Sequence, residues 1–147
     1  MKLRIVWIGK TKEPAISALT AEYLKRISRF LEAESMELPT EEALLKAVEK
    51  LSGRTRPVLV ILDQRGRQFT SEEFAEFLSD QQDRGSQQLL FAIGPADGFT
   101  DQGRHAADLV LSFGKMTLSH ELARVVLLEQ LYRAFTILKG HPYHKGH

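Results

Sequence analysis

Two short runs of apolar residues constrain the fold of this sequence more than any other feature. Residues 58–62 read Val-Leu-Val-Ile-Leu, and residues 89–93 read Leu-Leu-Phe-Ala-Ile. A strand with one face in water alternates apolar and polar residues, whereas a strand of a parallel sheet that helices cover on both faces is apolar throughout. The two runs therefore predict a mostly parallel sheet with helices on both faces.

The segments around these runs alternate between strand and helix patterns. We expect further strands at residues 3–8, 36–38 and 109–111, each rich in apolar residues and followed by a break. Helical spacing of apolar residues predicts helices that begin at Pro14, near Thr40, at the capping box formed by Thr70 and Glu73, and near Ser119. About five strands thus alternate with about five helices, which places the chain in the α/β class.

Length and composition exclude several kinds of protein. A chain of 147 residues with 43% hydrophobic content predicts a single domain, residues 1–147. The sequence has no cysteine, which excludes disulfides, thiolate catalysis and cysteine-ligated metals. The apolar run at residues 1–9 is short, carries charges and does not resemble a signal peptide, and no run approaches the roughly 18 apolar residues of a membrane span. We therefore expect a cytoplasmic protein with no membrane partner.

Charge is distributed unevenly along the chain. Residues 1–30 have a net charge of +5, residues 31–111 of −7, and residues 112–147 of +3, although the whole chain has only +1. If the two ends meet in the fold, they form a basic face that favours a polyanion such as RNA. The alternative is an even scatter of charge in three dimensions.

Three loops at predicted strand ends are candidate ligand sites, because ligands of open α/β sheets bind outside the carboxyl ends of strands. They are residues 62–66, 93–98 and 111–118. The glycines of the second loop allow close approach of a ligand, or form a tight turn, but they match neither a P-loop nor a dinucleotide-binding fingerprint. Asp63 in the first loop is a candidate ribose ligand or base, or the cap of a turn.

The final predicted helix, which runs to Lys139, is apolar around almost its whole circumference. Such a helix is normally buried on all sides, so we expect it to thread through the domain or to pack against a second subunit. Its polar residues then require partners. These are Arg124, Glu129, Gln130 and Arg133.

Titratable side chains gather near the C-terminus. His120, Tyr143 and His144 are candidate acid, base or hydrogen-bonding groups, or structural residues. A zinc site made from His141, His144 and His147 would have no carboxylate or cysteine ligand, so we expect no metal.

Residues 115–135 (Lys-Met-Thr-Leu-Ser-His-Glu-Leu-Ala-Arg-Val-Val-Leu-Leu-Glu-Gln-Leu-Tyr-Arg-Ala-Phe) and the Tyr-His-Lys at residues 143–145 closely resemble the ribosomal RNA large subunit methyltransferase H family, which belongs to the SPOUT class. The resemblance covers essentially the whole chain. The C-terminal motif is specific, and weaker matches follow the same order at residues 1–5, 22–27, 62–66 and 71–75.

The resemblance implies an α/β fold with a C-terminal trefoil knot, and a homodimer. It implies methyl transfer from S-adenosylmethionine to N3 of a pseudouridine in 23S rRNA, within the assembled ribosome. By motif position it also implies the residues that contact the methyl donor in the knot. These are Leu62, Gly94, Phe113, Gly114, Lys115, Met116, Thr117 and Leu118.

N3 of a pseudouridine must lose a proton, and His120, Tyr143 and His144 are the candidates for this role. Eight basic residues are candidates to bind RNA phosphates. The alternative for each of them is a charge that is solvated or that pairs in a dimer. They are Arg124, Arg133, Lys139 and Lys145, with Lys10, Lys12, Lys25 and Arg26.

One departure from the family is at Pro95. The family's second loop usually reads Gly-Gly-Pro-Glu-Gly, whereas residues 94–98 read Gly-Pro-Ala-Asp-Gly. Proline removes one backbone N–H that the family's second glycine provides. This keeps open a catalytically silent knotted dimer that binds RNA or ribosomes. A third hypothesis, a monomeric flavodoxin-like domain for a small ligand, fits the apolar last helix poorly.

Overall fold

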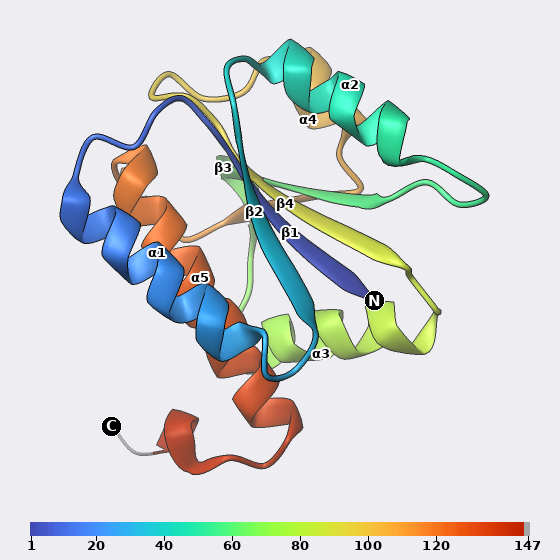
Figure 1. Cartoon of the computed structure of the whole chain (residues 1–147), viewed down its shortest axis with the longest axis vertical. Coiled ribbons are helices and arrows are strands. Elements are labelled where there is room, and N and C mark those ends of the chain that lie inside the picture. Colours follow the sequence, from blue (N-terminus) through green and yellow to red (C-terminus); the bar gives the residue numbers. More distant parts are fainter. Residues whose placement is uncertain (146–147) are drawn as a thin grey trace.

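The computed structural model describes residues 1–145, and its five strands form one parallel sheet in the order β2-β1-β4-β3-β5 (Figure 1). The parallel sheet predicted from the two apolar runs is confirmed. The strands are β1 (Lys2–Ile8), β2 (Glu32–Leu38), β3 (Val58–Gln68), β4 (Gln88–Ile93) and β5 (Leu109–Ser112).

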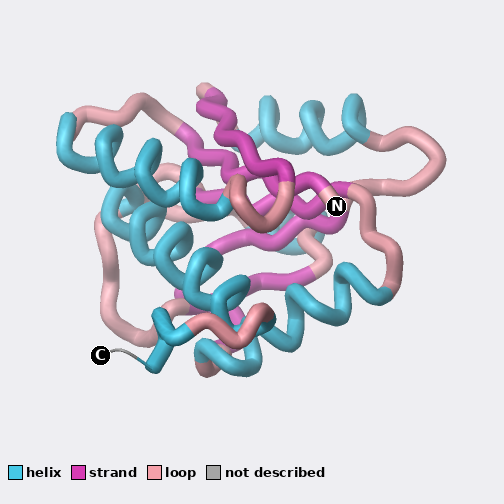
Figure 2. Tube along the Cα trace, turned by 60° about the horizontal axis from the view of Figure 1, so that its bottom comes forward, coloured by secondary structure: helices cyan, strands magenta, loops and turns pink. Residues whose placement is uncertain are grey.

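Helices cover both faces of the sheet (Figures 1 and 2). One face carries α1 (Pro14–Ile27), α3 (Ser71–Asp83) and α5 (His120–Leu138). The other face carries α2 (Glu41–Leu51) and α4 (Asp101–Ala106), and a short 3-10 helix, η1 (Pro142–Lys145), follows α5.

Helix ends follow local sequence signals. The side chains of Thr40, Thr70 and Ser119 cap α2, α3 and α5 by accepting a backbone N–H from the first turn. Glu73 returns a hydrogen bond to the backbone of Thr70, so the predicted capping box is confirmed.

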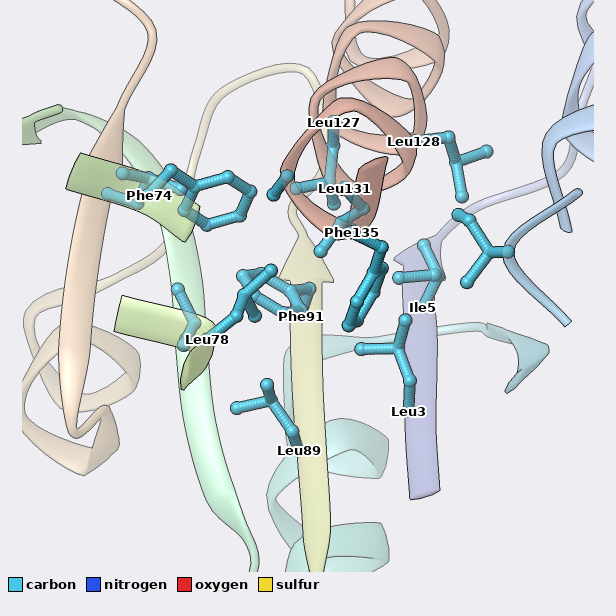
Figure 3. Close-up of a cluster of buried hydrophobic side chains, with 14 of the residues drawn as sticks. Leu3, Ile5, Phe74, Leu78, Leu89, Phe91, Leu127, Leu128, Leu131 and Phe135 are labelled. Atoms are coloured by element: carbon cyan, nitrogen blue, oxygen red, sulfur yellow. The ribbon is translucent and has the colours of Figure 1, made fainter. Parts of the chain in front are cut away.

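The core explains why the buried parts of the central strands are mostly apolar. Leu3 and Ile5 of β1 and Phe91 of β4 pack under α3 and α5 (Figure 3), and the intervening Val6 and Leu90 pack under α2 on the opposite face. All five side chains are fully buried. Successive residues of a strand point to opposite faces of the sheet, so burial of both faces favours apolar residues at successive positions.

Strand β2 is longer than its sequence indicates. The prediction began at Met36, but β2 begins at Glu32 and pairs with β1 along its whole length. As an edge strand it is largely exposed, and its glutamates bind cations of β1, with Glu34 Oε1 2.7 Å from Arg4 Nε. Polar residues are therefore tolerated there, which conceals the strand in an apolar-pattern search.

Strand β3 was predicted to end at Asp63, and this boundary is wrong. β3 continues to Gln68, but its pairing with β5 breaks after Leu62 and resumes at Arg67, so both residues face Leu111. Residues 63–66 form a bulge between the two paired parts, and we name them the β3 bulge. A bulge lets a strand change direction while its ladder continues. The knot that the resemblance implies stays a prediction.

Candidate active site

A pocket of about 250 Å³ lies where the carboxyl ends of β3, β4 and β5 meet. Its walls come from the β3 bulge, from the loop after β4 and from the loop after β5. These are the three loops that the sequence predicted as ligand sites, now brought together in space. The first turn of α5 completes the lining through His120 and Ala123.

Of the eight residues expected to contact a methyl donor, seven line this pocket. They are Leu62, Gly94, Phe113, Gly114, Met116, Thr117 and Leu118. Lys115 belongs to the same loop but is not in the lining, and it is exposed. The fold thus gathers segments that are up to about fifty residues apart in the sequence.

The β3 bulge is held in place from two sides. Gln64 Nε2 donates to Thr117 Oγ1 at 2.8 Å, which joins the bulge to the loop after β5. The carboxylate of Asp63 accepts the backbone N–H of Arg65 at 2.9 Å and lies 3.6 Å from Nη1 of Arg104 in α4. Asp63 therefore caps the bulge, as the expected role of a turn cap required. It also forms an ion pair in the pocket wall.

Sequence reasoning missed Arg104. Its guanidinium also donates to the backbone oxygen of Phe99 at 2.6 Å and pairs with Asp101. Arg104 therefore joins the loop after β4 to the β3 bulge. The six-residue helix α4 is too short to give the periodic pattern that would have drawn attention to this residue.

The loop after β4 is a tight turn at Pro95. The Gly98 N–H donates to the Pro95 carbonyl at 2.8 Å, and Gly98 has a φ of 85°, in the left-handed region that favours glycine. Gly94 is buried against Phe99, and a Cβ atom added to Gly94 would lie 2.9 Å from the Phe99 ring. The close approach of these two residues explains the glycine at position 94.

The loop after β5 presents apolar side chains at the surface. Met116 is 86% exposed, Phe113 is 36% exposed and Leu118 is 40% exposed. At the start of this loop the hydroxyl of Ser112 accepts the Gly114 N–H at 3.0 Å and donates to the Gly114 carbonyl at 3.1 Å, and Gly114 has a φ of 128°. The backbone of the loop is thus fixed while its side chains remain available.

Glu129, Gln130 and Arg133 of α5 have the hydrogen-bond partners that the sequence analysis required, whereas Nε and Nη2 of the buried Arg124 have none among the described residues. Arg124 is 1% exposed, its guanidinium lies 3.7 Å from the centroid of the Trp7 ring, and its Nη1 donates to Thr11 at 2.8 Å. Burial lowers its pKa, and a guanidinium remains charged nonetheless. The expectation that Arg124 contacts RNA phosphates is corrected, because its charged group does not reach the surface.

Of the three candidate bases, His120 begins α5, whereas Tyr143 and His144 lie beside the C-terminal end of this helix. His120 and Arg133 are separated by thirteen residues, about 20 Å along the helix. η1 folds back beside Arg133, and Figure 1 shows this end of α5 away from the pocket end. There Glu129, Arg133, Tyr143 and His144 form a group with Glu72 of α3, which we name the tail cluster.

Hydrogen bonds assign roles within the tail cluster. The Tyr143 hydroxyl donates to Glu129 Oε2 at 2.8 Å, and burial with this hydrogen bond raises the pKa of Tyr143. In this structure the Tyr143 hydroxyl is therefore a hydrogen-bond donor to Glu129, and its role as a base stays a prediction. His144 Nδ1 lies 3.3 Å from the Arg133 guanidinium, a group that only donates.

A hydrogen bond from Arg133 to Nδ1 requires the tautomer of His144 that carries its proton on Nε2, and Nε2 lies 2.8 Å from Glu72 Oε1. Of the three candidate bases, the structure of the chain brings only His120 to the pocket.

The remaining candidate RNA contacts have different surroundings. Lys10, Lys12, Lys25 and Lys139 are exposed, whereas Arg26 donates to Glu22 at 2.9 Å and packs over Tyr23. Arg133 is bound to Glu129 at 2.9 Å. The side chain of Lys145 lies outside the part of the chain that is described, as does His147 of the rejected zinc site.

No group of three or more potential metal ligands occurs among residues 1–145. Within the same residues no helix combines the length and apolarity that crossing a membrane requires.

A family model described as "Predicted SPOUT methyltransferase" matches residues 1–144, which places the chain in the SPOUT class of methyltransferases, and the parallel α/β fold with its pocket at the ends of β3, β4 and β5 agrees with that class. The chain belongs to the ribosomal RNA large subunit methyltransferase H family. It is 63% identical over 147 residues to the protein of that name from Koribacter versatilis, and covers all of both chains. The protein of that name from Citrifermentans bemidjiense is 45% identical, with 98% and 99% of the two chains covered.

Solved structures support the fold. A probable methylase family protein from Haemophilus influenzae Rd KW20 matches with a TM-score of 0.63 and 14% identity, over 96% of this chain and 69% of that one. The SpoU methyltransferase AviRb from Streptomyces viridochromogenes, in complex with the cofactor AdoMet, matches with a TM-score of 0.52 and 15% identity. That match covers 90% of this chain and little more than half (57%) of AviRb.

Proposed function

We propose that the chain transfers a methyl group from S-adenosylmethionine to N3 of a pseudouridine in large-subunit ribosomal RNA, as a homodimer acting on the assembled ribosome in the cytoplasm. The observation that carries the proposal is the single pocket wall that Leu62, Gly94 and the loop after β5 build together. Membership of the family supports the substrate class, because relatives at 63% and 45% identity are named for it.

The residues of the pocket fit S-adenosylmethionine. Leu62, Ile93 and Leu118 offer apolar surface for a purine ring, and Gly94 and Gly114 offer backbone groups without a side chain of their own in the pocket lining. Because the chain has no cysteine, the pocket has no thiol that the electrophilic sulfonium could alkylate. The bound cofactor supplies an activated methyl group.

The chain's own task is then alignment and proton removal. The bulge, the turn at Pro95 and the loop after β5 are joined by the Gln64–Thr117 and Arg104 contacts, so they form a preorganised wall. His120 is our candidate for the base that accepts the N3 proton, because its side chain lines this wall.

A homodimer accounts for the exposed apolar side chains. Leu19 of α1, Leu122 of α5 and Leu138 at the end of α5 are 43%, 52% and 37% exposed, and Met116 lies beside the pocket. Antiparallel pairing of two α5 helices would cover Leu122 and would bring the tail cluster of one subunit toward the pocket of the other. In that arrangement Tyr143 and His144 contribute hydrogen bonds to a shared site.

Calorimetry with S-adenosylmethionine tests the proposed function and its main alternative. A methyltransferase binds one cofactor molecule per pocket, whereas a catalytically silent RNA-binding dimer does not require the cofactor. Pro95 is the observation that favours the alternative, since its nitrogen has no hydrogen to donate. Pro95→Gly should raise cofactor affinity if the missing N–H matters, and should leave it unchanged if the turn alone matters.

A further inference from the structure

The loop of residues 9–13, between β1 and α1, is fixed to the first turn of α5, and we name it the β1–α1 loop. Glu121 Oε1 accepts the backbone N–H groups of Lys12 at 2.9 Å and of Glu13 at 3.2 Å. Arg124, one turn further along α5, holds the side chain of Thr11. Figure 1 shows this loop passing over the end of α5.

These contacts hold the loop by its backbone and by Thr11, and leave its lysines unengaged. Lys10 and Lys12 are exposed, and among residues 1–145 neither has a carboxylate within ion-pair distance. The acids nearby are Glu121, whose Oε1 is bound to the loop backbone, and the exposed Glu13. The loop therefore presents two exposed ammonium groups on a backbone that α5 holds in place.

These contacts place the backbone of the loop next to the turn of α5 that lines the pocket. Glu121 directly follows His120, and His120 and Ala123 line the pocket from the same turn of α5. A second exposed cation, Arg65, lies in the lining on the β3 bulge, and no carboxylate of the described residues is paired with it. Exposed cations thus occur both in the pocket lining, at Arg65, and on the neighbouring β1–α1 loop.

We propose that the β1–α1 loop is a phosphate-binding element that holds the RNA backbone beside the pocket through Lys10 and Lys12. The proposal rests on the proposed function, because it takes the polyanion to be the RNA substrate. Backbone phosphates suit this loop, because ammonium groups act as point charges and need no defined hydrogen-bond geometry. The hydrogen bonds of the loop to Glu121 and Arg124 then determine where beside the pocket the RNA backbone lies.

The test compares the double variant Lys10→Ala/Lys12→Ala with a matched control, Lys46→Ala/Lys50→Ala, which removes two exposed lysines from α2. Binding to 23S rRNA is measured at several salt concentrations, together with S-adenosylmethionine affinity. We expect the first variant to bind RNA about tenfold more weakly, with a salt dependence reduced by roughly two phosphate contacts. Cofactor affinity should stay at the wild-type value, and the control should match wild type throughout.

Equal RNA affinity and salt dependence in the two double variants would overturn the proposal. Failure of the proposed function is recognised separately, because it would show as loss of cofactor binding or methyl transfer in the wild-type protein.

A third variant, Glu121→Ala, tests the fixation of the loop. Removal of a negative charge should strengthen RNA binding by simple electrostatics, whereas release of the loop should weaken it. We expect weaker binding, and stronger or unchanged binding would contradict the role of the Glu121 contacts.

Discussion

Gly66 of the β3 bulge lies directly against the backbone of Val110 in β5. A Cβ atom added to Gly66 would be 2.5 Å from both the carbonyl carbon and the oxygen of Val110. Backbone atoms cannot rotate aside as a flexible side chain can, so no other residue fits without separating the two strands. The contact fixes the β3 bulge over β5, and the bulge in turn forms one wall of the pocket.

Gly66→Ala should therefore lower the free energy of unfolding by about 3 kcal/mol, at the upper end of ordinary overpacking costs. Urea denaturation measures this value. Gly53→Ala is the matched control, because nothing lies within 4 Å of a Cβ atom there, and its effect should stay within about 0.5 kcal/mol. Similar stability of the two variants would show that the strands do not approach each other so closely.

Gly94→Ala should weaken S-adenosylmethionine binding about tenfold, equivalent to about 1.4 kcal/mol, because the new methyl group narrows the pocket wall. It also crowds Phe99 and should destabilise the fold by about 1–3 kcal/mol. Adding Phe99→Leu relieves the crowding. Because Phe99 also lines the pocket, calorimetry compares the double variant with Phe99→Leu alone. Weaker cofactor binding in the double variant at equal stability places Gly94 in the cofactor site, and equal affinity contradicts that role.

His120→Ala should reduce kcat by between about 100- and 10,000-fold if His120 removes the N3 proton, with little change in cofactor affinity. Single-turnover methyl transfer measures the chemical step. His105→Ala serves as control, since His105 is an exposed histidine of α4 outside the pocket lining. A wild-type rate in His120→Ala would exclude this base.

Acid should release the β1–α1 loop from α5. The hydrogen bond from the Glu13 N–H, and then that from the Lys12 N–H, lower the pKa of Glu121 below its ordinary value. A carboxyl whose folded-state pKa is lowered stabilises the fold above its unfolded-state pKa, and this contribution disappears as pH falls through the lowered value. NMR shifts of the Lys12 and Glu13 amides should therefore titrate below the ordinary glutamate pKa of about 4.3. A midpoint at or above that value would contradict the contact.

The sequence predicted the central part of the fold because its physical basis is local. Burial of both faces makes β4 apolar from Leu89 to Ile93, and a threonine with a glutamate three residues later marks the start of α3. The edge strand β2 escaped prediction over residues 32–35, since its polar side chains point into solvent or bind cations of β1.

Long-range geometry limited prediction of the site. No local sequence pattern around Gly66 predicts that the backbone of Val110 lies against this residue. The burial of Arg124 under Trp7 and the separation of His144 from His120 likewise depend on how helices and strands far apart in sequence pack. Motif positions predicted the pocket residues better, because the three loops follow strands whose ends meet at one edge of the sheet.

The most direct test of the proposed function is transfer of a labelled methyl group from S-adenosylmethionine to ribosomes, with and without pseudouridine in the 23S rRNA. We predict incorporation into 23S rRNA only when the pseudouridine is present, and mapping of the label to N3 of that nucleotide. Absence of incorporation into pseudouridine-containing ribosomes, or equal incorporation into both kinds, would contradict the proposal.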